Sequence, residues 1–294
     1  MSQVAALGSR TVSRIGFGAM QLAGPGVFGP PRDPDGARAV LRRAIELGVD
    51  HIDTSQYYGP DVVNELIRES LAPYPETLTL VTKVGARRDE RGGWLPWNRP
   101  EELKQGVQDN LRTLGIERIA VNLRMMDDQD GSSEVSLGEQ IGALVELREA
   151  GAVEFIGVSN VTRATLQRAI GLTELACVQN AFSILDRGAE DVLELASEHG
   201  LAFVPFFPLG SAFTGGPAKL AADPEIAAVA AEHDATPSQI ALAWLLHRDP
   251  RILLIPGTTS VGHLEENLAA GEISLSASDL ERLSRVEPVA GPHG

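Results

Sequence analysis

The sequence is poor in cysteine: Cys177 is the single one among 294 residues. One cysteine excludes an intramolecular disulfide, and its place in the apolar stretch 175–178 predicts a small, buried hydrophobic residue. The six histidines show no H-x-x-x-H spacing and no cysteine partner. We therefore expect no metal site.

Basic residues are also scarce, with 25 Lys and Arg against 40 Asp and Glu and a formal net charge of −15. An acidic chain is a poor partner for nucleic acid or an anionic membrane. No apolar run is long enough to cross a bilayer, and residues 1–10 lack the apolar core of a signal peptide. We expect a cytoplasmic protein that acts on a small molecule, and its oligomeric state stays open.

What the sequence does contain is an alternation of short apolar runs, rich in Val, Ile and Phe, with segments of helical periodicity. The helical pattern predicts helices over 34–47, 100–114, 137–150, 165–172 and 192–199. The apolar runs predict eight strands, over 15–19, 51–54, 79–83, 119–124, 155–158, 176–179, 202–206 and 252–255.

Eight strands that alternate with helices predict an α/β fold, a closed (β/α)8 TIM barrel of parallel strands, with residues 1–294 as a single domain. The rival is a doubly wound Rossmann sheet, which requires G-x-G-x-x-G after its first strand. Here Gly16-Phe17-Gly18 is followed by Gln21 instead of the third glycine. In a barrel, functional residues lie at the carboxyl ends of the strands.

Three residues near consecutive strand ends could carry chemistry. Asp53 ends the second predicted strand, Tyr58 follows five residues later, and Lys83 ends the third. Tyrosine can give a proton to a carbonyl oxygen, but its ordinary pKa of about 10 makes it a weak acid. A lysine beside it favours the phenolate and lowers that pKa, while an aspartate keeps the lysine charged. Each residue alone has an ordinary structural role, so the joint placement is what favours catalysis.

Around these residues the sequence resembles the aldo/keto reductases. Asp53-Thr-Ser-Gln-Tyr-Tyr58-Gly59 is similar to their D-T-A-x-x-Y-G stretch, and Thr82-Lys83 to their lysine strand. Four more segments follow in the family's order: 156–160 (I-G-V-S-N), 179–180, 206–210, and 255–257 with 266–267. The likeness spans about residues 11 to 270 and implies a barrel enzyme that transfers a hydride between NADP(H) and a carbonyl carbon.

The resemblance also implies roles for individual residues. Tyr58 would be the general acid in reduction and the base in oxidation, with Asp53 and Lys83 in support. The nicotinamide carboxamide would bind Ser159, Asn160 and Gln179, and its ring would stack on Phe206. The remaining cofactor contacts would be Gly18, Ala19, Met20, Asp53, Pro208, Leu209, Gly210, Ser211, Pro256, Gly257, Thr258, Thr259, His263, Glu266 and Asn267.

The fourth strand departs from the family, which usually has a histidine where Arg124 stands. Asn122 has the same strand parity and should point inward one layer lower. Arginine does not titrate near neutrality, but it could hold the carbonyl oxygen, or a substrate carboxylate or phosphate through its forked donors. The alternative is a structural arginine paired with Asp127 or Asp128.

The second departure concerns the cofactor's 2′-phosphate. The family's Lys and Arg are replaced by Gly257 and His263. Thr258, Thr259, Ser260 and the following helix N-terminus could still bind a phosphate. We expect NADP, with NAD as the alternative.

The substrate end is expected to include Tyr58, Arg124 and two indoles, those of Trp94 and Trp97. The indoles could lie over the pocket and contact a flat apolar substrate, and the alternative is that they cap the barrel. The chain ends soon after residue 285, so we expect no long C-terminal lid and a wide pocket. Two other functions stay open: a nucleotide-binding sensor or accessory subunit with little turnover, and an isomerase or aldolase that uses Lys83 as a Schiff base. The natural substrate and the direction of reaction are not fixed by the sequence.

Overall fold

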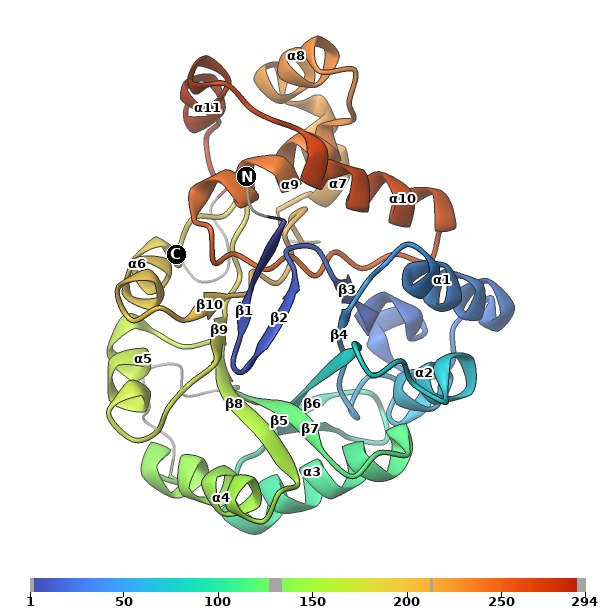
Figure 1. The fold of residues 1–294 in the computed structure, drawn as a ribbon, viewed down its shortest axis with the longest axis vertical. Helices are drawn as coiled ribbons and strands as arrows, with labels where there is room; N and C mark the ends of the chain where they lie inside the picture. Colours follow the sequence, from blue (N-terminus) through green and yellow to red (C-terminus); the bar gives the residue numbers. More distant parts are fainter. Residues whose placement is uncertain (1–2, 127–133, 212–213, 290–294) are drawn as a thin grey trace.

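The computed structural model describes residues 3–126, 134–211 and 214–289, and the predicted barrel is confirmed (Figure 1). Neighbouring strands pair in parallel in the order β10-β9-β8-β7-β5-β4-β3. Their bounds are β3 Phe17–Gly18, β4 His51–Asp53, β5 Thr79–Arg88, β7 Ile119–Arg124, β8 Val153–Ser159, β9 Cys177–Gln179 and β10 Ala202–Phe203.

The eighth position of the barrel is held by residues 252–254. This segment forms single parallel bridges, from Ile252 to Phe203 on one side and from Leu254 to Ile15 on the other. Hydrogen bonds from Gly16 N to Leu254 O (2.8 Å) and from Leu253 N to Phe203 O (3.0 Å) close the ring. The predicted strand over 252–255 is therefore in the right place, although its pairing is less regular than that of the other strands.

Helices surround the barrel on its outside (Figure 1). The five predicted helices are present as α1 Pro34–Glu46, α3 Pro100–Leu114, α4 Leu137–Glu149, α5 Arg163–Ile170 and α6 Glu190–Glu198. The described residues also form helices that were not predicted: α2 Val62–Leu71, α7 Gly216–Ala222, α8 Pro224–Glu232, α9 Pro237–Arg248, α10 Val261–Ala269 and α11 Ala277–Ser284.

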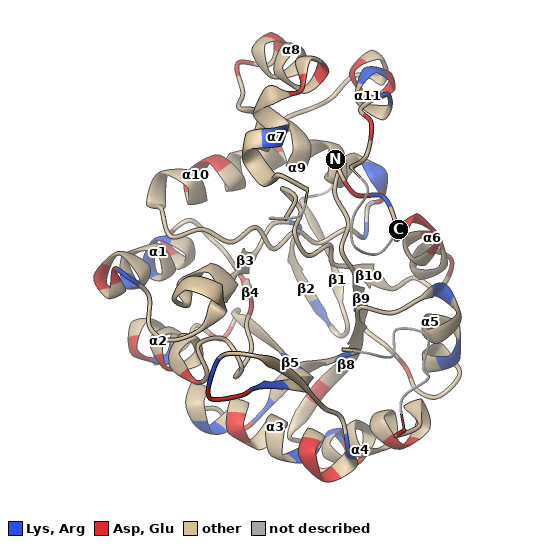
Figure 2. Cartoon of the chain, turned by 180° about the vertical axis from the view of Figure 1, so that it is seen from behind, with Lys and Arg blue, Asp and Glu red and all other residues tan. Residues whose placement is uncertain are grey.

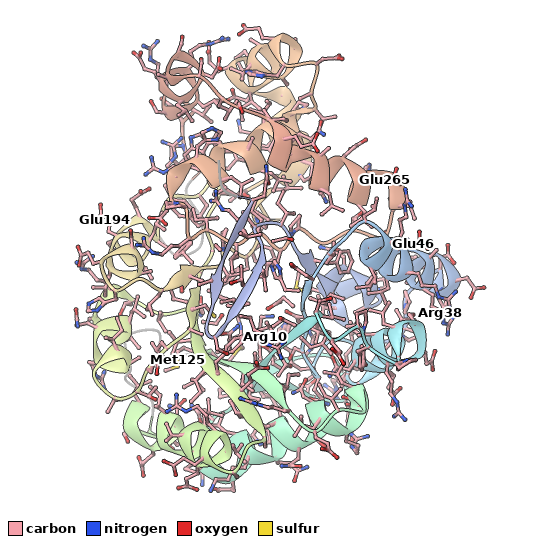
Figure 3. The ribbon with its side chains drawn as sticks, in the orientation of Figure 1. Arg10, Arg38, Glu46, Met125, Glu194 and Glu265 are labelled. Carbon is pink, nitrogen blue, oxygen red and sulfur yellow. The ribbon has the colours of Figure 1, made fainter. Side chains whose placement is uncertain are left out.

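Charged residues lie mainly on these outer helices (Figure 2). Exposed ion pairs join neighbouring helices. Arg43 of α1, for example, binds Glu46 of its own helix (3.2 Å) and Glu265 of α10 (2.8 Å), and the two glutamates lie close together in Figure 3. Exposed ion pairs of this kind contribute little to the stability of the folded state. Among the described residues, no helix is long and apolar enough to span a membrane.

An antiparallel hairpin, β1 Val4–Leu7 with β2 Arg10–Ser13, closes the amino-terminal end of the barrel. Leu7 and Val12 are buried there against inward-facing side chains of the strands. Asp50 accepts hydrogen bonds from Ser13 N (3.0 and 2.9 Å) and Ser13 Oγ (3.0 Å). Burial raises the pKa of Asp50, but hydrogen bonds from His51 and Ser13 outweigh burial and leave that pKa lowered. With this end plugged, access to the interior is from the carboxyl ends of the strands.

Two further pieces lie at the carboxyl-terminal end. Short 3-10 helices, η1 Ala19–Leu22 and η2 Pro25–Val27, follow β3. Strand β5 continues beyond the barrel and pairs antiparallel with β6 Trp94–Trp97. These segments shape the entrance to the site.

Candidate active site

A cavity of about 520 Å³ opens at the carboxyl ends of the strands, a volume that suits a small molecule and part of a cofactor. Its wall contains thirteen of the residues that the sequence predicted: Gly18, Met20, Asp53, Tyr58, Lys83, Trp94, Arg124, Phe206, Pro208, Leu209, Gly210, Pro256 and Gly257.

Asp53, Lys83 and Gln179 form a buried hydrogen-bonded cluster at the floor of the cavity. Lys83 Nζ donates to Asp53 Oδ1 and to Thr54 O (3.3 Å), and Gln179 Nε2 donates to Asp53 Oδ2 (2.7 Å). Strand alternation explains the meeting, because all three positions point into the barrel. Only 4% of each charged side chain is exposed. The two residues therefore form a buried ion pair, with no net charge, in the floor of the cavity.

Tyr58 lies in the turn after β4, where its N–H donates to Ser55 O (3.1 Å). Its ring is 5% exposed and lines the cavity, and Lys83 Nζ lies 5.2 Å from the ring centroid. Burial raises the pKa of Tyr58, the Asp53 carboxylate raises it further, and the Arg124 charge lowers it only in part. The expectation of a lowered pKa is wrong for this state, because it left out desolvation and the compensation of Lys83 by Asp53.

Arg124 faces the cavity, as its parity predicted. Its Nη1 donates to Ser159 Oγ (3.5 Å), and its Cζ lies 5.3 Å from the centroid of the Phe206 ring. The alternative partners Asp127 and Asp128 lie outside the described residues. One layer lower, Asn122 Oδ1 accepts a hydrogen bond from Cys177 Sγ (3.2 Å).

Cys177 is buried inside the barrel, as predicted. Burial raises the pKa of its thiol to about 12, so the thiolate needed for reactivity does not form near neutral pH. Among the described residues, no group of His, Cys, Asp and Glu is arranged to hold a metal ion.

The residues expected to bind a carboxamide lie just beneath the cavity surface and do not line the cavity itself. Asn160 Nδ2 donates to Met125 O (2.8 Å), so this amide already holds the end of β7. Ser159 and Gln179 are fully buried. Gln179 Oε1 is a buried acceptor with no hydrogen-bond partner among the described residues. An amide N–H donor from a ligand would satisfy it.

The residues expected at the pyrophosphate and adenosine ends divide into two groups. Phe206 to Gly210 and Pro256–Gly257 line the cavity. The others do not: Ala19, Ser211, Thr258, Thr259, His263, Glu266 and Asn267. Ser260 caps α10, accepting from His263 N (3.4 Å), and Thr258 Oγ1 accepts from Ser260 N (3.0 Å). Their cofactor role stays a prediction.

Aromatic rings form the outer wall. The Trp94 ring lies 5.2 Å from that of Tyr57, which lies 5.4 Å from that of Tyr58, both edge to face. The guanidinium of Arg88 lies 4.0 Å from the Trp94 ring centroid. Trp94 is 41% exposed, at the entrance.

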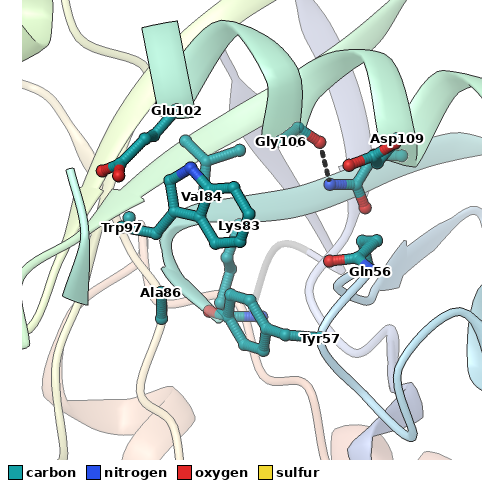
Figure 4. Close-up of a pocket in the computed structure, with 11 residues that line it drawn as sticks. Gln56, Tyr57, Lys83, Val84, Ala86, Trp97, Glu102, Gly106 and Asp109 are labelled. Atoms are coloured by element: carbon teal, nitrogen blue, oxygen red, sulfur yellow. Dashed lines mark hydrogen bonds between the residues drawn. The ribbon is translucent and has the colours of Figure 1, made fainter. Parts of the chain in front are cut away.

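The expectation that both indoles lie over the pocket is corrected for Trp97. Positions 94 and 97 are three apart on β6, so their side chains face opposite sides of the strand. Trp97 packs on Arg87 (4.3 Å) and lines a separate cavity of about 20 Å³ behind Tyr57 (Figure 4).

Seven lining residues were not among the predicted site residues: Gln21, Val27, Tyr57, Met126, Phe207, Pro217 and Ile255. Tyr57 stands inside the family motif, so the motif could have indicated it. Phe207 has a positive φ of 56°, a backbone state that its sequence does not signal.

Comparison with known proteins agrees with this fold. The Aldo/keto reductase family profile matches residues 14–288, and the chain belongs to this family. It is 50% identical over 282 residues to pyridoxine 4-dehydrogenase of Escherichia coli (strain K12), with 95% of this chain and 96% of the relative covered. It is 36% identical over 278 residues to an uncharacterized oxidoreductase of Schizosaccharomyces pombe, with 94% and 87% covered.

Solved structures show the same fold. A thermostable aldo-keto reductase in complex with the inhibitor epalrestat matches with a TM-score of 0.81 and 28% identity, over 96% of this chain and 99% of that one. An aldo/keto reductase from Klebsiella pneumoniae in complex with NADP and acetate matches with a TM-score of 0.79 and 24% identity, over 98% and 96%. The chain is thus an oxidoreductase of the aldo/keto reductase family.

Proposed function

We propose that this protein reduces ring aldehydes to alcohols with NADPH, and that pyridoxal, which gives pyridoxine, belongs to its substrates. The observation that carries the proposal is the position of Tyr58 in the cavity wall, above the buried pair of Lys83 and Asp53. The 50% identity to a pyridoxine 4-dehydrogenase supports the choice of substrate. The Trp94 indole in the cavity wall suits a flat substrate ring.

Tyr58 is the proton donor in this mechanism. Because burial and Asp53 raise its pKa, the phenol carries its proton at neutral pH. The proton moves to the carbonyl oxygen as negative charge develops there. Arg124, whose charge lowers the pKa of Tyr58, stabilises the phenolate that remains. In the reverse direction the same phenolate takes the proton from the alcohol.

Lys83 and Asp53 hold an ammonium group next to the Tyr58 ring, where the phenolate forms. The ammonium lies below the Tyr58 ring and is held by Asp53 and Thr54 O. Since Gln179 also donates to Asp53 (2.7 Å), the carboxylate is fixed from both sides. Such a preorganised arrangement does not have to reorient during the reaction.

The residues present fit a nicotinamide cofactor. The unpartnered Gln179 Oε1 can accept from a carboxamide, Ser159 lies beside it at the end of β8, and the Phe206 ring can cover a flat heterocycle. When bound, NADPH supplies the hydride. Pro208 to Ser211 and Pro256 to Thr259 would hold its phosphates and adenosine, with N–H groups at the start of α10 for the 2′-phosphate. NAD is the alternative, and comparison of the dissociation constants of NADPH and NADH tests the preference.

A turnover assay tests the proposal. The protein is mixed with NADPH and a panel that contains pyridoxal, 4-nitrobenzaldehyde and aliphatic ketones. We expect loss of the reduced-nicotinamide absorbance and one alcohol formed for each NADPH consumed. If NADPH binds but no carbonyl compound is reduced, the protein is a nucleotide sensor. If borohydride traps the substrate on Lys83, the Schiff-base mechanism replaces ours.

A further inference from the structure

The charges that line the large cavity do not cancel. Asp53 is the only carboxylate among the described lining residues, whereas Lys83 and Arg124 both contribute cations. Both carboxylate oxygens of Asp53 already accept hydrogen bonds, one from Lys83 and one from Gln179. Within the described part of the chain, Arg124 makes only a long hydrogen bond to the neutral Ser159 (3.5 Å) and a contact with the Phe206 ring. In a chain with net charge −15, the described lining of this cavity therefore presents one positive charge to a ligand.

The position of this charge relative to the acid limits where the ligand's anion can be. Arg124, Tyr57 and Tyr58 line the same cavity, so a ligand there can contact both the guanidinium and the phenol that protonates the carbonyl oxygen. A guanidinium offers parallel N–H donors in a rigid fork. It fits a ligand in which a second, negatively charged oxygen stands beside the carbonyl oxygen.

The walls indicate what carries these two oxygens. Trp94 and Tyr57 line the same cavity as Arg124 and Tyr58, and their rings pack edge to face with centroids 5.2 Å apart. A flat ring fills such a space, while a flexible aliphatic oxo acid leaves it partly empty. On a ring, the group that sets an anionic oxygen beside an aldehyde is an ionised hydroxyl on the adjacent carbon.

We propose that the cavity selects ring aldehydes with an ionised hydroxyl on the carbon next to the aldehyde carbon, and that Arg124 is the residue that recognises this oxide. The inference rests on the proposed function and deepens it, because pyridoxal carries such a hydroxyl. Arg124 binds the oxide and the carbonyl oxygen together, and the same contact turns the carbonyl toward Tyr58.

Two probes of similar size test the recognition. They are 3-hydroxypyridine-4-carbaldehyde, which ionises, and 3-methoxypyridine-4-carbaldehyde, which does not. For the wild type we expect kcat/KM to favour the hydroxy probe by about 10- to 100-fold, the range of hydrogen bonds to a charged group. Arg124→Gln should remove this preference. Arg124→Lys, which keeps the charge and loses the fork, should retain part of it.

Arg88→Gln is the matched control. Arg88 is an arginine at the same entrance, stacked on Trp94 (4.0 Å), and it does not line the cavity. Arg88→Gln should change kcat/KM for both probes by the same factor, so the ratio of the two kcat/KM values should equal that of the wild type. A ratio in Arg124→Gln equal to that of the wild type would overturn the proposal. A larger loss of kcat/KM in Arg124→Gln for phenylglyoxylate than for the hydroxy probe would also overturn it, because the site would then recognise a carboxylate.

Failure of the two proposals can be told apart. If the wild type reduces the methoxy probe and the hydroxy probe with equal kcat/KM, the proposed reductase activity is supported and the proposed oxide site is refuted. If neither probe is reduced, binding of unreactive 3-hydroxypyridine without NADPH still decides the oxide site, since its absorption spectrum reports ionisation of the hydroxyl. We expect the wild type to lower the pKa of the bound hydroxyl relative to Arg124→Gln, and equal values in the two proteins would refute the site.

Discussion

Replacement of Tyr58 by phenylalanine separates the chemistry of the site from its architecture. The ring, which is buried in the cavity wall, is retained in Tyr58→Phe. None of the side-chain hydrogen bonds among the described residues uses the Tyr58 hydroxyl, so the free energy of unfolding should fall by less than about 1 kcal/mol. Loss of the general acid should lower kcat/KM by about 10²- to 10⁴-fold, which corresponds to about 3–5 kcal/mol in the barrier.

The assay compares this variant with Tyr57→Phe. Tyr57 is buried beside Tyr58, with ring centroids 5.4 Å apart, and lines the same cavity. Steady-state reduction of 4-nitrobenzaldehyde gives kcat/KM, quenching of protein fluorescence gives the NADPH dissociation constant, and urea denaturation gives stability. We expect both variants to bind NADPH as the wild type does, and only Tyr58→Phe to lose turnover. Near-normal turnover in Tyr58→Phe with a large loss in Tyr57→Phe would make Tyr57 the acid and refute the assignment.

Three other substitutions test separate parts of the structure. Asp53→Asn leaves Lys83 buried without its carboxylate, so urea denaturation should show about 3–5 kcal/mol less stability; a loss below about 1 kcal/mol would contradict a buried ion pair. Trp94→Ala should raise KM for ring aldehydes while Trp97→Ala should not, because only the first indole lines the cavity, and equal effects would disprove this division. Asp50→Asn should lower stability by about 1 kcal/mol at neutral pH. Since the pKa of Asp50 is lowered in the folded state, its contribution to stability is present above the unfolded pKa and disappears as pH falls through the folded pKa. If the wild type and Asp50→Asn differ in unfolding free energy as much below the folded pKa as at neutral pH, this prediction is wrong.

The parts of the fold that follow from local periodicity were predictable. Inward-facing positions repeat every second residue along a strand, and Asp53, Lys83 and Arg124 each end a predicted strand, so the sequence predicts them at the carboxyl end of the barrel. The regularity of pairing was not predictable, because the eighth strand depends on bridges to Phe203 and Ile15 from distant parts of the chain.

Site residues that belong to a sequence motif were predictable. Features of the site that depend on tertiary packing were less so. The motif gave Tyr58, but the upward direction of its pKa depends on how much of the chain covers the ring. Trp97 seemed equivalent to Trp94 in sequence, yet the pairing of β6 with β5 turns it to the other side. Phe207 lies in the wall and has a positive φ, which no pattern of apolar residues indicates.

Transfer of a label from the cofactor to the product shows whether a hydride passes between them at this site. NADPH that carries deuterium at the transferable position of C4 is mixed with pyridoxal in a single turnover, and the product is analysed by mass spectrometry and proton NMR. We expect pyridoxine with one deuterium on the carbon of the former aldehyde, formed in amounts equal to the NADPH consumed. Product without deuterium at that carbon, or bound NADPH that is never oxidised, would contradict hydride transfer at this site.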